Sequence, residues 1–258
     1  MSIDYQQILL QLAHERLPHP RTHTYSYEYF IKMFIHILND VTSYIALKRL
    51  FNLTSNHYKY INQVFNKWTK LNIFEDAYYK YLNYYLNINY NSQSTIEMYI
   101  GATNIYNKNG SECVAYGSYK KKKISKLSVI SDKKVPLQIN LYNGNMHDIK
   151  TIEPEIINMI NSISYRKINI AGDKGYVSKI LKQKLKLVNI NLITPCKKNQ
   201  LHKNTKHDKQ ILKNRFYVEH MNHLFKNYMR IALRKDRNRD TFMSYVYLAA
   251  IIIISKYV

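Results

Sequence analysis

The segment KINIAGDKGY, from Lys167 to Tyr176, joins a short apolar run to an aspartate with glycines close by. The run from Lys167 to Ala171 predicts a short buried strand, and Asp173 follows it almost directly. In open α/β sheets, ligands bind beyond the carboxyl ends of the strands, where glycine lets the backbone approach them. Asp173 is therefore a candidate metal ligand, although the same position also suits a turn aspartate or a helix N-cap.

Strands and helices alternate on both sides of this segment. Residues 96–103 alternate apolar and polar side chains, which predicts a strand that runs towards a hairpin turn at Asn109-Gly110. Further strands are expected at 127–131, 135–141 and 190–194, and helices at 154–163, 176–187, 215–233 and 241–255. This order predicts an α/β fold with a mixed sheet flanked by helices.

The first third of the chain has a different pattern. Apolar side chains recur at helical spacing in residues 3–15, 29–53 and 58–86. The periodicity changes to that of a strand just after residue 92. The sequence therefore predicts an all-helical domain over residues 1–92 and an α/β domain over residues 93–258.

The charge balance is strongly basic. Lys and Arg number 39 against 17 Asp and Glu, which gives a net charge of +22 and a pI near 9.7. A field of this sign attracts polyanions, so nucleic acid is the first partner to consider and an anionic membrane surface the second. The codon bias of an AT-rich genome would explain much of the lysine, but it gives no reason for the scarcity of acidic residues.

Membrane insertion and secretion are both disfavoured. Residues 245–258 are apolar, yet this stretch is shorter than the roughly 20 residues that span a bilayer, so a buried core helix is expected. The N-terminus has no readable signal peptide, and Cys113 and Cys196 suit a reducing compartment. We expect an intracellular, DNA-associated protein without a membrane partner, with membrane-surface anchoring through the C-terminal helix as a weaker alternative.

The expected helix at 215–233 holds the second candidate for chemistry. Arg215, Glu219 and Lys226 form a stripe beside its apolar face. A carboxylate flanked by cations on a helix most often forms surface ion pairs. In a nuclease-like site, however, the carboxylate would bind a divalent ion while the cations hold phosphate groups.

These motifs resemble the transposase domain of bacterial insertion-sequence elements of the type-four and type-five superfamily. Residues 171–176 are similar to the family's A-D-K-G-Y segment around its second catalytic Asp, with one residue inserted. Arg215, Glu219 and Lys226 fit its signature of Tyr, two residues, Arg, three residues, Glu, six residues and Lys, with Leu212 replacing the Tyr. Residues 58–74, 126–136 and 140–150 are similar to further family segments in the same order.

The resemblance implies a fold, an activity and a set of partners. The fold would be an RNase H-like DDE domain after a helix-turn-helix-like DNA-binding domain. The activity would be that of a DNA transposase, with Asp173 and Glu219 holding two Mg²⁺ or Mn²⁺ ions and Arg215 and Lys226 orienting DNA. The partners would be double-stranded transposon ends and target DNA, bound by a homo-oligomer.

Two basic patches contain none of the candidate catalytic carboxylates. They are either solvated faces or surfaces that follow a DNA backbone, and the second interpretation is favoured because they flank the candidate site. Their residues are Lys120, Lys121, Lys122 and Lys123 in the first patch, and Arg230, Arg234 and Arg237 in the second.

One departure from the family concerns its first catalytic Asp. That residue opens an I-D-x-T-x-I strand, and Gly101 stands in its place in the segment IGATNI. Glycine supplies no metal ligand, and Glu97 on the same strand face is about 13 Å away at the usual rise of a strand. Asp132 and Asp148 match other family positions. We therefore expect impaired cleavage, with a catalytically inactive, DNA-binding relic or domesticated protein as the alternative.

Overall fold

The computed structural model describes residues 4–17, 25–40, 44–53, 57–90, 95–117, 121–160, 167–196 and 203–258. The chain forms two compact units that interleave along the sequence. The helical unit comprises Met1–Tyr85, Tyr106–Glu112 and Phe225–Val258, and the sheet unit comprises Leu86–Ile105 and Cys113–Leu224.

The helical unit is built around aromatic side chains. Its helices are α1 (Tyr5–Arg16), α2 (Tyr27–Asp40), α3 (Tyr44–Leu50), α4 (His57–Lys70), α5 (Ile73–Asn89, which ends in the sheet unit), α10 (Met229–Ala232) and α11 (Arg239–Ile254). Phe34, Phe65, Trp68 and Phe74 meet in its core, and Tyr245 from α11 stacks on Phe65 with ring centroids 4.1 Å apart. Such aromatic pairs stabilise a core beyond their area burial.

Two expectations for the helices are refined. The helices expected at 29–53 and 58–86 each form two helices, and the second break falls at Asn72, whose φ of 53° is left-handed. Asparagine tolerates this conformation better than most residues. The C-terminal helix α11 is a core helix as predicted, because most of its residues from Phe242 to Ile254 are buried. Among the described residues, no helix is long and apolar enough to cross a membrane.

A buried arginine joins distant segments of the helical unit. Arg234 is 0% exposed, and its guanidinium donates hydrogen bonds to the carbonyl oxygens of Glu112 (2.7 Å), Asp236 (3.1 Å) and Arg237 (3.2 Å). A Cβ atom on Gly110 would lie 2.7 Å from the Arg234 Cζ, so only glycine fits there. Guanidinium donors thereby satisfy backbone carbonyls that burial would otherwise leave unpaired.

The sheet unit contains a mixed sheet flanked by helices, as predicted. The strands are β1 (Ile96–Asn107), β2 (Ala115–Gly117), β3 (Lys122–Ser131), β4 (Pro136–Asn143), β5 (Ile168–Ala171) and β6 (Ile190–Ile193). The order is β2-β3-β1-β5-β6, with β4 also paired to β3. β3 and β4 form an antiparallel hairpin, whereas β1, β5 and β6 run parallel. The last two residues of β1 pair with the short β7 (Leu233–Arg234).

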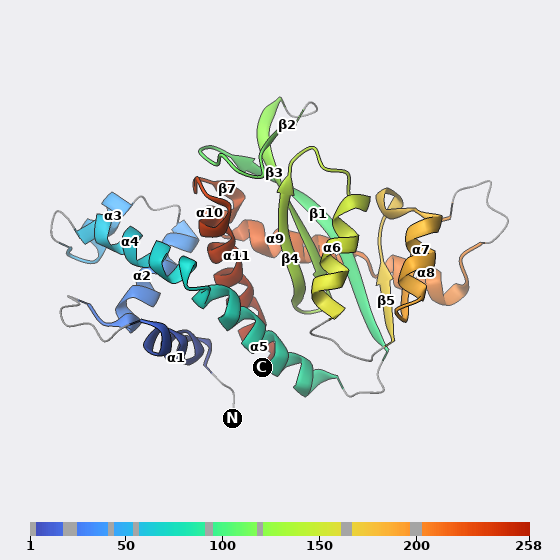
Figure 1. Ribbon diagram of the computed structural model, residues 1–258, viewed down its shortest axis with the longest axis horizontal. Helices are drawn as coiled ribbons and strands as arrows, with labels where there is room; N and C mark the ends of the chain where they lie inside the picture. The colour runs from blue at the N-terminus through green and yellow to red at the C-terminus, as the bar shows by residue number, and fades with distance from the viewer. Residues whose placement is uncertain are drawn as a thin grey trace. The chain divides into compact units, whose positions relative to one another are not determined.

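Helices cover both faces of this sheet. Figure 1 shows α6 (Ile149–Ile160) in front of the sheet and α9 (Phe216–Asn227) behind it. The helix expected at 176–187 begins later, as α7 (Lys179–Lys186), because the 3-10 turn η1 (Lys174–Tyr176) precedes it. The unpredicted α8 (Lys206–Lys213) starts with a capping box between Thr205 and Asp208.

The buried side of α6 carries an acidic residue. Glu155 is 0% exposed beside the hydroxyl groups of Ser128 and Tyr142. Burial raises the pKa of its carboxyl group to about 8, and the two hydroxyl groups act in the opposite direction. The folded chain therefore holds this proton more tightly than the unfolded chain does.

We expect Arg234→Met to lower the free energy of unfolding by about 3 kcal/mol, because the carbonyl groups of Glu112, Asp236 and Arg237 each lose a hydrogen bond from the buried guanidinium. Arg237→Met is the matched control, since Arg237 is exposed, and it should change stability by less than about 0.5 kcal/mol. Urea denaturation of both variants measures the difference. Equal stabilities would contradict a structural role for Arg234.

We expect Glu155→Gln to remove a pH dependence of stability. Because the folded pKa is raised above the usual 4.5, the contribution of Glu155 is present below pH 4.5 and is lost as pH rises through 8. The unmodified chain should therefore lose stability relative to Glu155→Gln across this range. Thermal unfolding at a series of pH values tests this, with the exposed Glu153→Gln on the same helix as a control that keeps the dependence.

Candidate active site

The register between β1 and β5 places two predicted site positions, Gly101 and Asp173, at the same distance along the two strands. The strands pair in parallel from Ile96 with Ile168 to Tyr99 with Ala171. Gly101 and Asp173 each lie two residues beyond this last pair, on strands whose usual spacing is about 4.8 Å. Asp173 therefore lies just beyond the carboxyl end of β5, where α/β proteins bind ligands, and Gly101 lies in β1 at the point where the pairing with β5 ends.

Asp173 caps a turn. Its Oδ1 accepts a hydrogen bond of 2.7 Å from the backbone N–H of Gly175, at the start of η1. The N-cap interpretation of Asp173 is thus confirmed. Metal binding remains compatible with it, because an ionised carboxylate has about four lone-pair sites and this bond uses one.

A second carboxylate approaches the same glycine. A Cβ atom on Gly175 would lie 3.0 Å from Asp173 Oδ1 and 3.3 Å from Asp148 Oδ2. Asp148 is already bound, since the Lys126 ammonium lies 2.6 Å from its Oδ1 and also donates to the Met146 carbonyl oxygen. Lys126 therefore lowers the negative potential beside Asp173.

Helix α9 packs against the Gly101 position. A Cβ atom on Gly101 would lie 3.0 Å from Val218 Cγ1 and 3.5 Å from Asn222 Nδ2. The rings of Tyr99 and Tyr217, with centroids 5.6 Å apart, bring the start of the helix against the same strand. Burial is the main reason that the pKa of the Tyr99 phenol is raised well above its usual value, so this hydroxyl group stays protonated.

Glu219 follows Val218 in the first turn of α9. Its side chain is 60% exposed, and its Oε1 lies 2.5 Å from Arg215 NH2. The surface ion pair expected from the spacing is thus present. Arg215 and Glu219 are brought together, and Lys226 lies half-buried near the end of the same helix.

Two other acidic residues near β1 are engaged in structural contacts. Glu97 accepts a hydrogen bond of 3.0 Å from the Tyr99 hydroxyl and pairs with Lys133 at 3.4 Å. Asp132 is buried and accepts bonds of 2.7 Å from the Tyr90 hydroxyl and from the backbone of Val135. Both carboxylates therefore have partners of their own. Among the described residues, no group of three or more His, Cys, Asp or Glu side chains could hold a metal ion.

The predicted basic patches are partly corrected. Lys121, Lys122 and Lys123 are exposed, whereas Lys120 lies outside the described residues. Arg237 is exposed as well.

Arg230 and Arg234 are buried, at 6% and 0% exposure, so the expectation that they contact DNA is wrong for this conformation. Arg230 instead forms a two-bond ion pair with Asp236, at 3.0 and 2.6 Å, and lies over the Tyr245 ring. Arg234 is occupied by the carbonyl groups described above.

Asn222 is a site residue to which sequence reasoning gave no role. It is 9% exposed, and its Oδ1 has no hydrogen-bond partner in the part of the chain that the structure describes. Its position three residues after Glu219 was the available signal, because residues at this spacing are neighbours on a helix. Its polarity at a buried position could not be read from the sequence.

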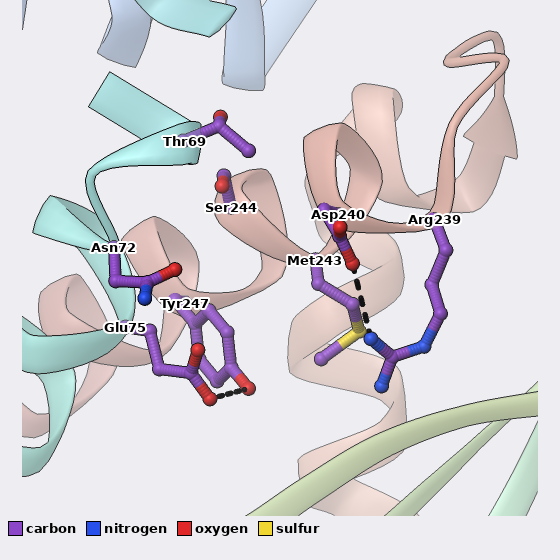
Figure 2. Close-up of a pocket in the computed structure, with 8 residues that line it drawn as sticks. All are labelled: Thr69, Asn72, Glu75, Arg239, Asp240, Met243, Ser244 and Tyr247. Atoms are coloured by element: carbon purple, nitrogen blue, oxygen red, sulfur yellow. Dashed lines mark hydrogen bonds and ion pairs between the residues drawn. The ribbon is translucent and has the colours of Figure 1, made fainter. Parts of the chain in front are cut away.

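A separate small pocket lies in the helical unit, where α4 meets α5 and α11 begins (Figure 2). Its acidic groups already have partners: Glu75 accepts a bond of 2.9 Å from the Tyr247 hydroxyl, and Asp240 lies 3.1 Å from Arg239. None of the predicted catalytic residues lines this pocket, so it is not the candidate active site.

Comparison with known proteins agrees with this geometry. Residues 121–239, which include Asp173 and Glu219 but not Gly101, match the family model of the transposase DDE domain. No curated protein matches the chain. The chain is similar in fold to the piggyBac transposase of a synaptic complex with hairpin DNA, with a TM-score of 0.58 and 11% identity over 97% of this chain and 70% of that one.

A weaker likeness, with a TM-score of 0.30 and 11% identity, links 60% of this chain to 88% of the catalytic domain of Mos1 mariner transposase. The RNase H-like fold expected from the resemblance is confirmed, and the family uses divalent metal ions for nucleotidyl transfer. Residues 121–239 thus resemble a transposase DDE domain, and the chain has the fold of a transposase with an RNase H-like sheet.

Proposed function

We propose that this chain is a DDE transposase of the insertion-sequence type, which acts at transposon ends by metal-dependent phosphoryl transfer, with strand cleavage impaired by Gly101. The observation that carries the proposal is the shared level of Gly101 and Asp173 beyond the β1–β5 pairs, with the helix of Glu219 packed on Gly101. This is the arrangement that three catalytic carboxylates would need, with one of them missing.

Asp173 and Glu219 are the groups that would hold metal. Their carboxylate oxygens are the hard ligands that Mg²⁺ and Mn²⁺ prefer. Two such ions, when bound, activate the attacking oxygen and stabilise the leaving one. Gly101 contributes no side-chain oxygen, so one of the three carboxylates expected to bind the metal ions is missing.

Basic residues would position the DNA. Arg215 and Lys226 lie on the helix of Glu219, and Lys121 to Lys123 with Arg237 add exposed positive charge. The similar piggyBac transposase was solved in a synaptic complex with hairpin DNA. By analogy, this chain would bind double-stranded transposon ends and target DNA, and it would do so as a homo-oligomer. Residues 1–92 would serve as a helix-turn-helix-like DNA-binding domain and residues 93–258 as the catalytic domain.

A second candidate function is DNA binding without catalysis, as a relic or a domesticated transposase. The same Gly101 favours it, because a DNA-binding protein has no need of the first carboxylate. The two functions differ in whether the unmodified chain retains any strand cleavage.

We expect no detectable cleavage of terminal-repeat DNA by the unmodified chain with Mg²⁺ or Mn²⁺, and cleavage by Gly101→Asp. Because a Cβ atom at this position approaches Val218 to 3.0 Å, the double variant Gly101→Asp, Val218→Ala should cleave better than the single one. Regaining a metal ligand should raise the rate roughly a hundredfold or more. A gel assay with labelled ends measures the product.

Two variants control this experiment. Val218→Ala alone tests the effect of repacking, and Gly101→Asn with Val218→Ala supplies the same shape without the charge; both should stay far below the aspartate variant. Robust cleavage by the unmodified chain would show that Gly101 does not impair the site.

DNA affinity should fall steeply with salt, because it depends on contacts between cations and phosphate groups. Replacing Lys121, Lys122 and Lys123 by Ala should reduce the slope of log affinity against log salt by up to about 3. The matched control replaces Lys182, Lys184 and Lys186 by Ala. These lysines are exposed on α7, so the control removes the same amount of positive charge. Equal slopes for the two triple variants would make the first run an ordinary solvated face.

A further inference from the structure

Asn222 is a buried polar side chain with an unexplained oxygen. Its residue exposure is 9%, and Oδ1 has no hydrogen-bond partner among the described residues. Leaving a buried amide oxygen without a partner destabilises the fold, because the oxygen loses its hydrogen bonds to water and gains none in return. Native proteins rarely carry such a cost without a ligand, an ion or a water molecule in that place.

The carboxamide lies where the missing carboxylate would begin. Its Nδ2 is 3.5 Å from the position of a Cβ atom on Gly101, and Gly101 is level with Asp173 across the β1–β5 pair. The oxygen and nitrogen of an amide exchange places by a rotation of the group, which changes little else. Either amide atom can therefore face the Gly101 position, where the pairing between β1 and β5 ends.

Asn222 is also a neighbour of the helix carboxylate. Glu219 precedes it by three residues on α9, a spacing that puts the Cβ atoms about 5–6 Å apart. The carboxamide of Asn222 thus lies between the Gly101 position and the stripe of Glu219. Helix α9 would thus provide two oxygen ligands from one face, those of Glu219 and Asn222. The third ligand would be Asp173, which follows β5.

We infer that Asn222 supplies the oxygen ligand that Gly101 lacks, so that the chain binds one divalent cation between Asp173, Glu219 and the Asn222 carboxamide. This inference rests on the proposed function and deepens it. Carbonyl oxygens of asparagine are accepted ligands of hard divalent cations. Because the carboxamide is neutral, the site carries two negative charges where three carboxylates would carry three, and its affinity is correspondingly lower.

The neighbouring carboxylates are poorer substitutes. Asp148 is bound to Lys126, Asp132 to Tyr90 and the backbone of its own turn, and Glu97 to Tyr99 and Lys133. None of these carboxylates is among the nearest neighbours of a Cβ atom on Gly101, which are Val218 and Asn222. The Asn222 oxygen has no such bond to break within the described residues. Cation binding, in contrast to cleavage, therefore survives the loss of the first Asp.

The test measures Mn²⁺ binding to the full chain without DNA, through the electron paramagnetic resonance signal of free Mn²⁺. Asn222→Leu should weaken the affinity about tenfold or more, and Asn222→Asp should strengthen it by a similar factor, because a carboxylate replaces a neutral oxygen. Asn227→Asp places the same new charge farther along α9 and should change the affinity less than about twofold. The shift of the unfolding temperature by Mn²⁺ gives a second readout, which should follow the same order.

Asp173→Asn separates the inference from the proposed function. If Asp173→Asn abolishes Mn²⁺ binding while Asn222→Leu leaves it unchanged, the role of Asn222 is overturned and the proposed metal site stands. If the unmodified chain binds no Mn²⁺ but Gly101→Asp does, the same conclusion holds. Binding that survives Asp173→Asn overturns the metal site itself. Should Asn222→Leu fail to fold, Asn222→Asp decides, because an affinity no tighter than that of Asn227→Asp contradicts the inference.

Discussion

Four parallel pairs between β1 and β5 set the positions of Gly101 and Asp173, on which the candidate active site depends. They set Gly101 level with Asp173, and they turn the Tyr99 side of β1 towards α9. Side chains alternate between the faces of a strand, so a slip of one residue would turn the position of Gly101 to the face that α6 covers. All four residues of β5 are buried, as are Ile96 and residues 98–101 of β1, and burial favours this register because a slip of one residue would turn Glu97 to the opposite face of the sheet.

Much of this arrangement could be predicted from the sequence. The alternation from Ile96 to Thr103 and the apolar run before Asp173 each specify a strand from local information. The family spacing of Arg215 and Glu219 anticipated a helix in the right place. These features depend on neighbours within a few residues, which a sequence pattern records.

The features that were missed depend on distant partners. Arg230 and Arg234 stand in a segment with the polarity of a surface, and their burial depends on Asp236, on aromatic rings of α11 and on carbonyl groups near residue 112. Asn222 looks like any polar helix residue until β1 is packed against it. α8 was missed because its hydrophobic side is short, with Ile211 as its buried residue.

The guanidinium of Arg234 also constrains the order in which the chain can fold. Its bond to the carbonyl of Glu112 joins residues 122 positions apart, and Gly110 cannot complete its packing before Arg234 arrives. Every segment of the sheet unit is synthesised before α10 and α11, whereas the helical unit awaits these last elements. During translation the sheet unit can therefore form first, while the apolar faces of α2 and α4 remain uncovered by α11. Before α11 is made these apolar faces are exposed, so the helical core closes only after the strands of the sheet unit have been able to pair.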